Sequence, residues 1–145
     1  IIILALAYSL NDLSAMLNTA GYIVSITESW LTSKVLPMLA FLITAIVAFS
    51  TGTSWGTYAI MIPIAVPLAF NFSGGELDTI VYATIAAVAG GGGFGDHCSP
   101  LSDTSILAST GAASDHIDHI KTQMPYALLI GFISVLIYLG VGWLL

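Results

Sequence analysis

The sequence has 145 residues, of which 57% are hydrophobic and only 7% are charged, and its formal net charge is −6. Soluble domains usually carry about 25% charged residues, so this chain has too little charge to cover a water-facing surface. Eight acidic residues against two basic ones exclude nucleic-acid binding, which needs a basic patch, and the single cysteine excludes an internal disulfide. The composition therefore predicts an all-α membrane protein that contacts a lipid bilayer.

The first segment is apolar from Ile1 to Ile26 and is interrupted at Asn11 and Asp12. It is consistent with one tilted span or with two half-helices that meet at the interruption. No second acid accompanies Asp12, so we interpret it as a residue near the membrane interface rather than as a site. Trp30, in the polar connection that follows, is expected to anchor the chain at the interface. Because the chain opens inside an apolar run without a signal-peptide pattern, we expect it to be a piece of a longer membrane protein.

The region 36–70 consists of two apolar arms, Leu36 to Phe49 and Tyr58 to Phe70, on either side of the hydroxyl-rich stretch STGTSWGT. Each arm would reach only about 20 Å, which is less than the roughly 30 Å of a hydrocarbon core. The pattern favours a re-entrant helical hairpin whose tip lies in the membrane interior. A single long kinked helix, with Ser and Thr bonding to their own turns, is the alternative.

The region 79–112 predicts a discontinuous (broken) transmembrane helix. A half-helix from Thr79 to Ala89 meets four consecutive glycines, Gly90 to Gly93, and Pro100 follows them. Glycine is costly in a helix and proline removes a backbone donor, so we expect the helix to open at Gly90 and to form again only around Leu101. The glycines lack the spacing of a phosphate-binding loop. They instead favour close approach of another backbone.

Asp96 and Asp103 border this predicted break. Ionisable groups at membrane depth are functional candidates by default, and carboxylates, hydroxyls and free carbonyls are hard donors that suit Na⁺. A desolvated carboxylate that loses its cation tends to take up a proton, which is the physical basis of exchange. Asp103 also suits the N-cap of a helix beginning at Thr104, and capping alone is the alternative for this residue.

The last part contains a polar stretch, 114–123, and a plain transmembrane helix, Met124 to Leu145. His116 and His119 stand three positions apart, which is compatible with a metal site. The polar surroundings favour a solvated loop or helix start instead, and a pH-sensing or gating role is the lesser alternative.

Two blocks of the chain resemble the NhaC-type sodium/proton antiporters: AFSTGTSWGT, from Ala48 to Thr57, and GDHCSPLSDTSILASTGAASDHIDHIKTQMPYAL, from Gly95 to Leu128. That family belongs to the ion-transporter superfamily, whose fold has two inverted repeats, each with a re-entrant hairpin and a broken helix. The resemblance implies that residues 1–145 form the C-terminal repeat and that the N-terminal half lies upstream. It also implies an ion-binding site framed by Asp96, Ser99, Asp103 and Thr104 together with Thr51, Thr53 and Ser54, with Na⁺ at Asp96 and Asp103. Ser105 stands where the family usually has a second threonine.

The predicted function is therefore a secondary active antiporter, not an enzyme, that exchanges Na⁺ for H⁺ as a multi-pass protein of a bacterial inner membrane. No cofactor is expected, and a homodimer is one possible assembly. An exchanger of malate or lactate coupled to the same ions is the first alternative, because the family includes such carriers. An intramembrane metal-dependent hydrolase built on the histidines and a channel are the remaining alternatives.

Overall fold

A computed structural model of the chain describes residues 31–144 continuously, together with residues 9, 12, 13, 16–18, 22, 25 and 26. The half-helices predicted before Ile26 and the anchor role of Trp30 lie outside the continuously described part. Within that part the structure is helical and contains no strand. Its elements are η1 (Ser33–Val35), α3 (Leu36–Thr51), α4 (Ser54–Phe72), α5 (Thr79–Cys98), α6 (Asp103–Gly111) and α7 (His116–Leu144).

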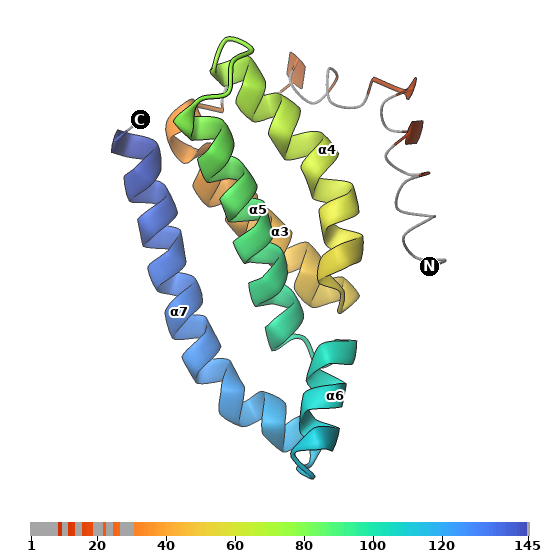
Figure 1. Cartoon of the computed structure of the whole chain (residues 1–145). Coiled ribbons are helices and arrows are strands. Elements are labelled where there is room, and N and C mark those ends of the chain that lie inside the picture. The colour runs from red at the N-terminus through yellow and green to blue at the C-terminus, as the bar shows by residue number, and fades with distance from the viewer. Residues whose placement is uncertain are drawn as a thin grey trace.

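Helices α3 and α4 form an antiparallel hairpin (Figure 1). The chain reverses at Gly52, whose φ of 68° lies in the left-handed region that glycine adopts without strain. Thr53 is extended and caps α4, because its hydroxyl accepts a hydrogen bond from the Gly56 N–H. The two predicted arms are two antiparallel helices rather than one kinked helix, and both extend further than predicted. Each is long enough to cross a membrane, so the short reach on which the re-entrant prediction rested is not found.

The four glycines do not interrupt α5, so the prediction that the helix opens at Gly90 is wrong. The helix runs to Cys98, and α6 starts at Asp103. A side chain at Gly91 would collide with the carbonyl of Phe41, and one at Gly95 would collide with the carbonyl of Ala45. The glycines thus let the backbones of α3 and α5 approach closely, and this packing offsets their low helix propensity.

The interruption lies instead at Ser99–Ser102, where Pro100 has no N–H to continue the α5 hydrogen-bond ladder. Ser102, not Asp103, is the N-cap of α6: its hydroxyl accepts from the Ser105 N–H at 3.3 Å. Asp103 occupies the first turn, where its negative charge interacts favourably with the helix dipole.

Helix α7 also differs from the prediction, because it begins at His116 rather than at Met124. The Asp115 carboxylate accepts hydrogen bonds from the backbone N–H groups of Ile117 and Asp118, at 2.9 and 3.1 Å, and so starts the helix within the polar stretch. At the other end of α7, Gly142 packs on the backbone of Lys34, whose ammonium lies 4.7 Å from the centre of the Trp143 ring.

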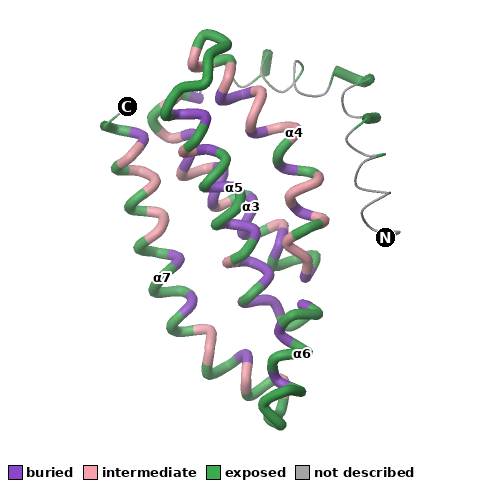
Figure 2. Tube along the Cα trace, in the orientation of Figure 1, coloured by how far each residue is buried: buried purple, intermediate pink, exposed green. Residues whose placement is uncertain are grey.

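Three segments of the described chain are long and apolar enough to cross a membrane: Ser33–Thr51, Ser54–Phe72 and His116–Leu144. Burial concentrates on α3 and α5, whereas α7 is mostly exposed or partly exposed (Figure 2). The exposed surface of α7 is rich in Leu, Ile, Phe and Tyr, which is what a lipid-facing helix requires. The prediction of an all-α membrane protein is consistent with this architecture.

Candidate functional site

Asp96 is the buried carboxylate of the described chain. It lies in the last turn of α5 and is only 6% exposed. One carboxylate oxygen, Oδ2, accepts a hydrogen bond from the Thr104 hydroxyl at 3.4 Å, which is a long contact. The other, Oδ1, is buried and has no hydrogen-bond partner among the described residues. A buried charged oxygen without a partner is costly, so this atom has an unused bonding position for a proton, a cation or a water molecule.

A chain of hydroxyls leads from the N-terminus of α6 to this carboxylate. The Ser102 hydroxyl lies 2.7 Å from that of Thr104, and Ser102 is completely buried. When Asp96 is ionised it can only accept, so Thr104 must donate to it and Ser102 must donate to Thr104. The Ser105 N–H in turn donates to Ser102. All donors in this chain therefore point toward the carboxylate and stabilise its charge.

Ser99 ties the end of α5 to the end of α3. Its hydroxyl donates to the Phe49 carbonyl at 2.7 Å and accepts from the Leu101 N–H at 3.1 Å. Ser99 is fully buried, and its two bonds fix the start of the α5–α6 connection against the hairpin. The same contact is reinforced at Gly52, where an added Cβ would lie 2.7 Å from the carbonyl carbon of Leu101. The hairpin tip and the helix interruption are therefore packed together.

The hydroxyls predicted at the tip mainly serve the tip itself. Thr51 donates to the Val47 carbonyl at 2.9 Å and lies 3.3 Å from the hydroxyl of Thr57. Thr53 is the N-cap of α4, and Ser54 is partly exposed in its first turn. The hydroxyls of Thr51 and Thr57 thus form a second group, and the tip meets the α5–α6 connection where Gly52 packs on Leu101.

The two predicted aspartates differ in burial. Asp96 is buried, whereas Asp103 and Thr104 are exposed at the start of α6. Of the predicted residues, the structure brings together Asp96 and Thr104 directly, and it joins Ser99 to the hairpin through Phe49.

Both histidines lie in the first turns of α7 and are partly exposed, as predicted for a solvated loop or helix start. The contacts of the His116 ring, in contrast, are not predicted by the sequence. The Nε2 atom of His116 lies 2.9 Å from the Pro100 carbonyl, and Nδ1 lies 3.2 Å from the Ser109 hydroxyl. Among the residues that the structure describes, no three His, Cys, Asp or Glu side chains gather as a metal site would require.

Sequence reasoning missed Ser102, Ser105 and Thr57 as members of these hydroxyl groups. Ser105 donates to the His97 carbonyl at 3.1 Å, and Thr57 donates to the Thr53 carbonyl at 2.8 Å. All three stand inside the two blocks already identified by resemblance, and that position is the signal that could have found them. The carbonyl of Phe49 carries no sequence signal, because any residue has one.

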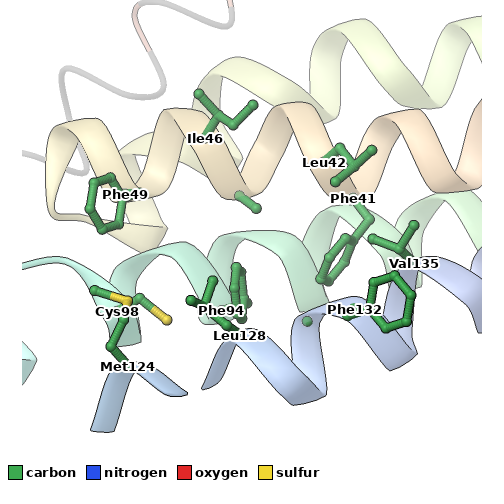
Figure 3. A pocket seen from close by; sticks show the side chains of 12 residues that line it. Phe41, Leu42, Ile46, Phe49, Phe94, Cys98, Met124, Leu128, Phe132 and Val135 are labelled. Atoms are coloured by element: carbon green, nitrogen blue, oxygen red, sulfur yellow. The ribbon is translucent and has the colours of Figure 1, made fainter. Parts of the chain in front are cut away.

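An apolar groove of about 680 Å³ runs between α3, α5 and α7 (Figure 3). Phe49, Cys98 and Met124 line one end, and Phe41, Phe132 and Val135 line the other. The groove offers almost no polar atoms, so it is unsuited to a cation and suited to hydrocarbon. The candidate cation site is therefore the polar cluster at Asp96.

Membrane-length helices around a buried ionisable residue are typical of membrane transport proteins. The chain belongs to the Na⁺/H⁺ antiporter family, which it matches over residues 1–143. No solved structure matches it. The family and the relatives described next are antiporters rather than enzymes.

Three relatives are informative. The chain is 41% identical over 104 residues to an uncharacterized Na⁺/H⁺ antiporter of Haemophilus influenzae, covering 71% of this chain and 21% of that protein. It is 34% identical over 113 residues to the arginine/ornithine antiporter ArcD of Halobacterium salinarum, covering 78% and 22%. It is 28% identical over 107 residues to the malate-2H⁺/Na⁺-lactate antiporter of Bacillus subtilis, covering 74% and 22%. The chain spans between 21% and 27% of the length of the curated relatives it matches.

Proposed function

We propose that the protein is a secondary antiporter that exchanges Na⁺ for H⁺ and that Asp96 binds the two ions in turn. The observation that carries this proposal is the buried Oδ1 atom of Asp96, which has no hydrogen-bond partner in the described chain. Either a proton on the carboxyl group or a cation beside it satisfies that atom. The two ions compete for one oxygen, so they cannot occupy it together.

The atoms around Asp96 support the set of ion-binding residues that the family resemblance implies. Thr104 reaches Asp96 directly, and Ser99 holds the connection next to it. Hydroxyl and carbonyl oxygens are the ligands that hard cations prefer. Asp103, exposed in the first turn of α6, adds a negative charge that attracts cations toward the site. We assign Thr51, Thr53 and Ser54 to the hairpin side of the same site.

The proposal includes a membrane arrangement. The α3–α4 hairpin re-enters the membrane, and α5 and α6 together act as one broken helix around Ser99–Ser102. Irregular backbone at membrane depth is tolerated where it is packed in protein or lines a wet cavity. The connection is held by the Ser99 and Ser102 hydroxyls, which accept hydrogen bonds from the N–H groups of Leu101 and Ser105. The chain then forms one repeat of a longer, multi-pass transporter in a bacterial inner membrane.

An organic exchanger coupled to the same ions is the second candidate, favoured by the names of two relatives. One exchanges malate and lactate with H⁺ and Na⁺, and another exchanges arginine and ornithine. The cluster at Asp96 presents a single buried carboxylate, which suits a small cation better than a molecule of that size.

The test uses the full-length protein in sealed proteoliposomes that contain a pH-sensitive dye. An outward Na⁺ gradient should drive proton movement without any organic solute, and K⁺ at the same concentration should serve as the control. Proton movement that requires malate, lactate or an amino acid would instead support the organic exchanger. Na⁺ flux that no pH gradient can drive uphill would indicate a channel.

A further inference from the structure

His116 is the side chain through which α7 holds the α5–α6 connection. Its two ring nitrogens contact different parts of the chain: the Pro100 carbonyl at 2.9 Å and the Ser109 hydroxyl of α6 at 3.2 Å. Ser109 is only 2% exposed, so its hydroxyl depends on protein partners rather than on solvent for its hydrogen bonds. One imidazole thus joins the start of α7, the end of α6 and the helix interruption.

One tautomer of the neutral ring makes both contacts. The Pro100 carbonyl can only accept, so Nε2 donates to it, and Nδ1 accepts from the Ser109 hydroxyl. The Ile106 carbonyl, which Ser109 also reaches at 2.9 Å, has a second donor in the Thr110 hydroxyl at 2.8 Å. The hold of His116 on the connection therefore rests on the geometry of its two ring nitrogens.

We infer that His116 is a positioning residue for the candidate cation site, because its ring holds the α5–α6 connection at Pro100 and ties it to α6 at Ser109. The inference rests on the proposed function for its link to transport. Its structural part, the hold on the connection, stands independently of which ion is carried.

The path from His116 to the site is short and is made of hydrogen-bonded groups. Pro100 lies between Ser99, which is bonded to the hairpin, and Leu101, which packs on Gly52. Ser102 follows Leu101, and its hydroxyl is hydrogen-bonded to that of Thr104, which in turn donates to Asp96. Releasing the Pro100 carbonyl frees the middle of this connection, so the Thr104 hydroxyl loses its fixed position at the carboxylate.

No ionisable side chain of the described residues is hydrogen-bonded to the imidazole. The contacts to Pro100 and Ser109 are therefore the ones that a substitution of His116 removes.

The first test measures the reactivity of Cys98, which is 3% exposed and immediately precedes the connection. In the full-length protein with any other cysteines replaced, a small water-soluble thiol reagent should label Cys98 slowly. His116→Ala should raise the labelling rate roughly five- to tenfold, the size expected when one or two hydrogen bonds no longer oppose local opening. His119→Ala is the matched control and should leave the rate unchanged, because the His119 ring makes no hydrogen bond in the described chain.

His116→Gln separates hydrogen bonding from loss of the ring. Its amide keeps a donor that can reach Pro100, so we expect its labelling rate to stay closer to that of the wild type than to that of His116→Ala. Ser109→Ala removes the partner of Nδ1 and should raise the labelling rate less than His116→Ala does, because the contact to Pro100 remains.

Transport supplies the second readout. In proteoliposomes, His116→Ala should raise the Na⁺ concentration that gives half-maximal exchange by roughly tenfold and change the maximal rate less, because it disturbs a binding geometry. The hold on the connection is disproved if His116→Ala and His119→Ala label Cys98 equally. If the wild type shows no Na⁺-driven proton movement but the labelling results hold, the proposed function fails and the positioning role of His116 stands.

Discussion

Gly52 lies directly against Leu101, so the tip of the α3–α4 hairpin touches the connection between α5 and α6. An added Cβ at Gly52 would stand 2.7 Å from both the carbonyl carbon and the carbonyl oxygen of Leu101. The two residues are far apart in the sequence, and each belongs to an irregular segment between helices. Their contact joins the two segments that carry the candidate site.

Gly52→Ala should therefore damage both stability and transport. Gly52 has a φ of 68°, so alanine there costs about 1 kcal/mol or more in backbone strain before any clash is counted. Gly74→Ala is the matched control, because Gly74 has a φ of 72° and nothing within 4 Å of an added Cβ. Thermal unfolding in detergent and Na⁺-driven proton movement in vesicles measure the two effects.

We expect Gly74→Ala to lose a little stability and to retain exchange, and Gly52→Ala to lose more stability and most of its exchange. Equal behaviour of the two variants would mean that the contact between Gly52 and Leu101 has no role beyond backbone conformation.

Alanine substitutions at two nearby glycines of α5 are expected to have opposite effects on stability. Gly95→Ala would force a side chain into the Ala45 carbonyl and to 2.8 Å from the Ala48 Cβ, so we expect at least about 2 kcal/mol of destabilisation. Gly93→Ala meets only the Tyr58 hydroxyl, at 3.9 Å, and should be neutral or stabilising by up to about 1 kcal/mol because alanine favours a helix. Denaturant unfolding of both proteins tests this; a tolerated Gly95→Ala would refute close packing of α3 and α5.

Thr44 and Thr84 offer a second matched pair, since both are completely buried. The Thr84 hydroxyl donates to the Ile80 carbonyl at 2.8 Å, whereas the Thr44 hydroxyl has no partner in the described chain. Thr44→Val should leave the free energy of unfolding unchanged or raise it, because the hydroxyl is buried without a bond. Thr84→Val should lower it by about 1 kcal/mol. The reverse order would show that the Thr44 hydroxyl has a partner outside residues 31–144.

The sequence predicts the helices well where the polar interruptions are local. The hydroxyl-rich block around Gly52 marks the hairpin turn, and the structure has this turn between the end of α3 at Thr51 and the start of α4 at Ser54. The position of the α5 interruption was misjudged because the penalty of four glycines is visible in the sequence, whereas the close contact with Phe41 and Ala45 that offsets it is not. Pro100 marks the interruption, but proline alone does not predict one, because Pro63 and Pro67 lie inside α4 and Pro125 lies inside α7.

In the candidate site, too, the sequence predicts local features but not contacts between distant segments. Asp96 is predicted from its position beside glycines in an apolar chain, and the structure buries it. The exposure of Asp103 could not be predicted, because it depends on which face α6 turns toward α5. His116 was assigned to solvent from its polar neighbours. Its partner Pro100 is distant along the chain, and only the turn between α6 and α7 brings them together.

The most direct test of the central claim compares Asp96→Asn with Asp103→Asn in Na⁺-driven proton movement by the full-length protein in proteoliposomes. Asparagine keeps the shape of the side chain but removes its charge and its capacity to carry the exchanged proton. Asp96→Asn should lower exchange roughly a hundredfold or more, because removing one member of a buried charge pair costs about 3 kcal/mol or more. Asp103→Asn, at an exposed position, should raise the Na⁺ concentration for half-maximal exchange only a few-fold and keep most of the maximal rate. Substantial exchange by a correctly inserted Asp96→Asn protein at saturating Na⁺ would contradict the account.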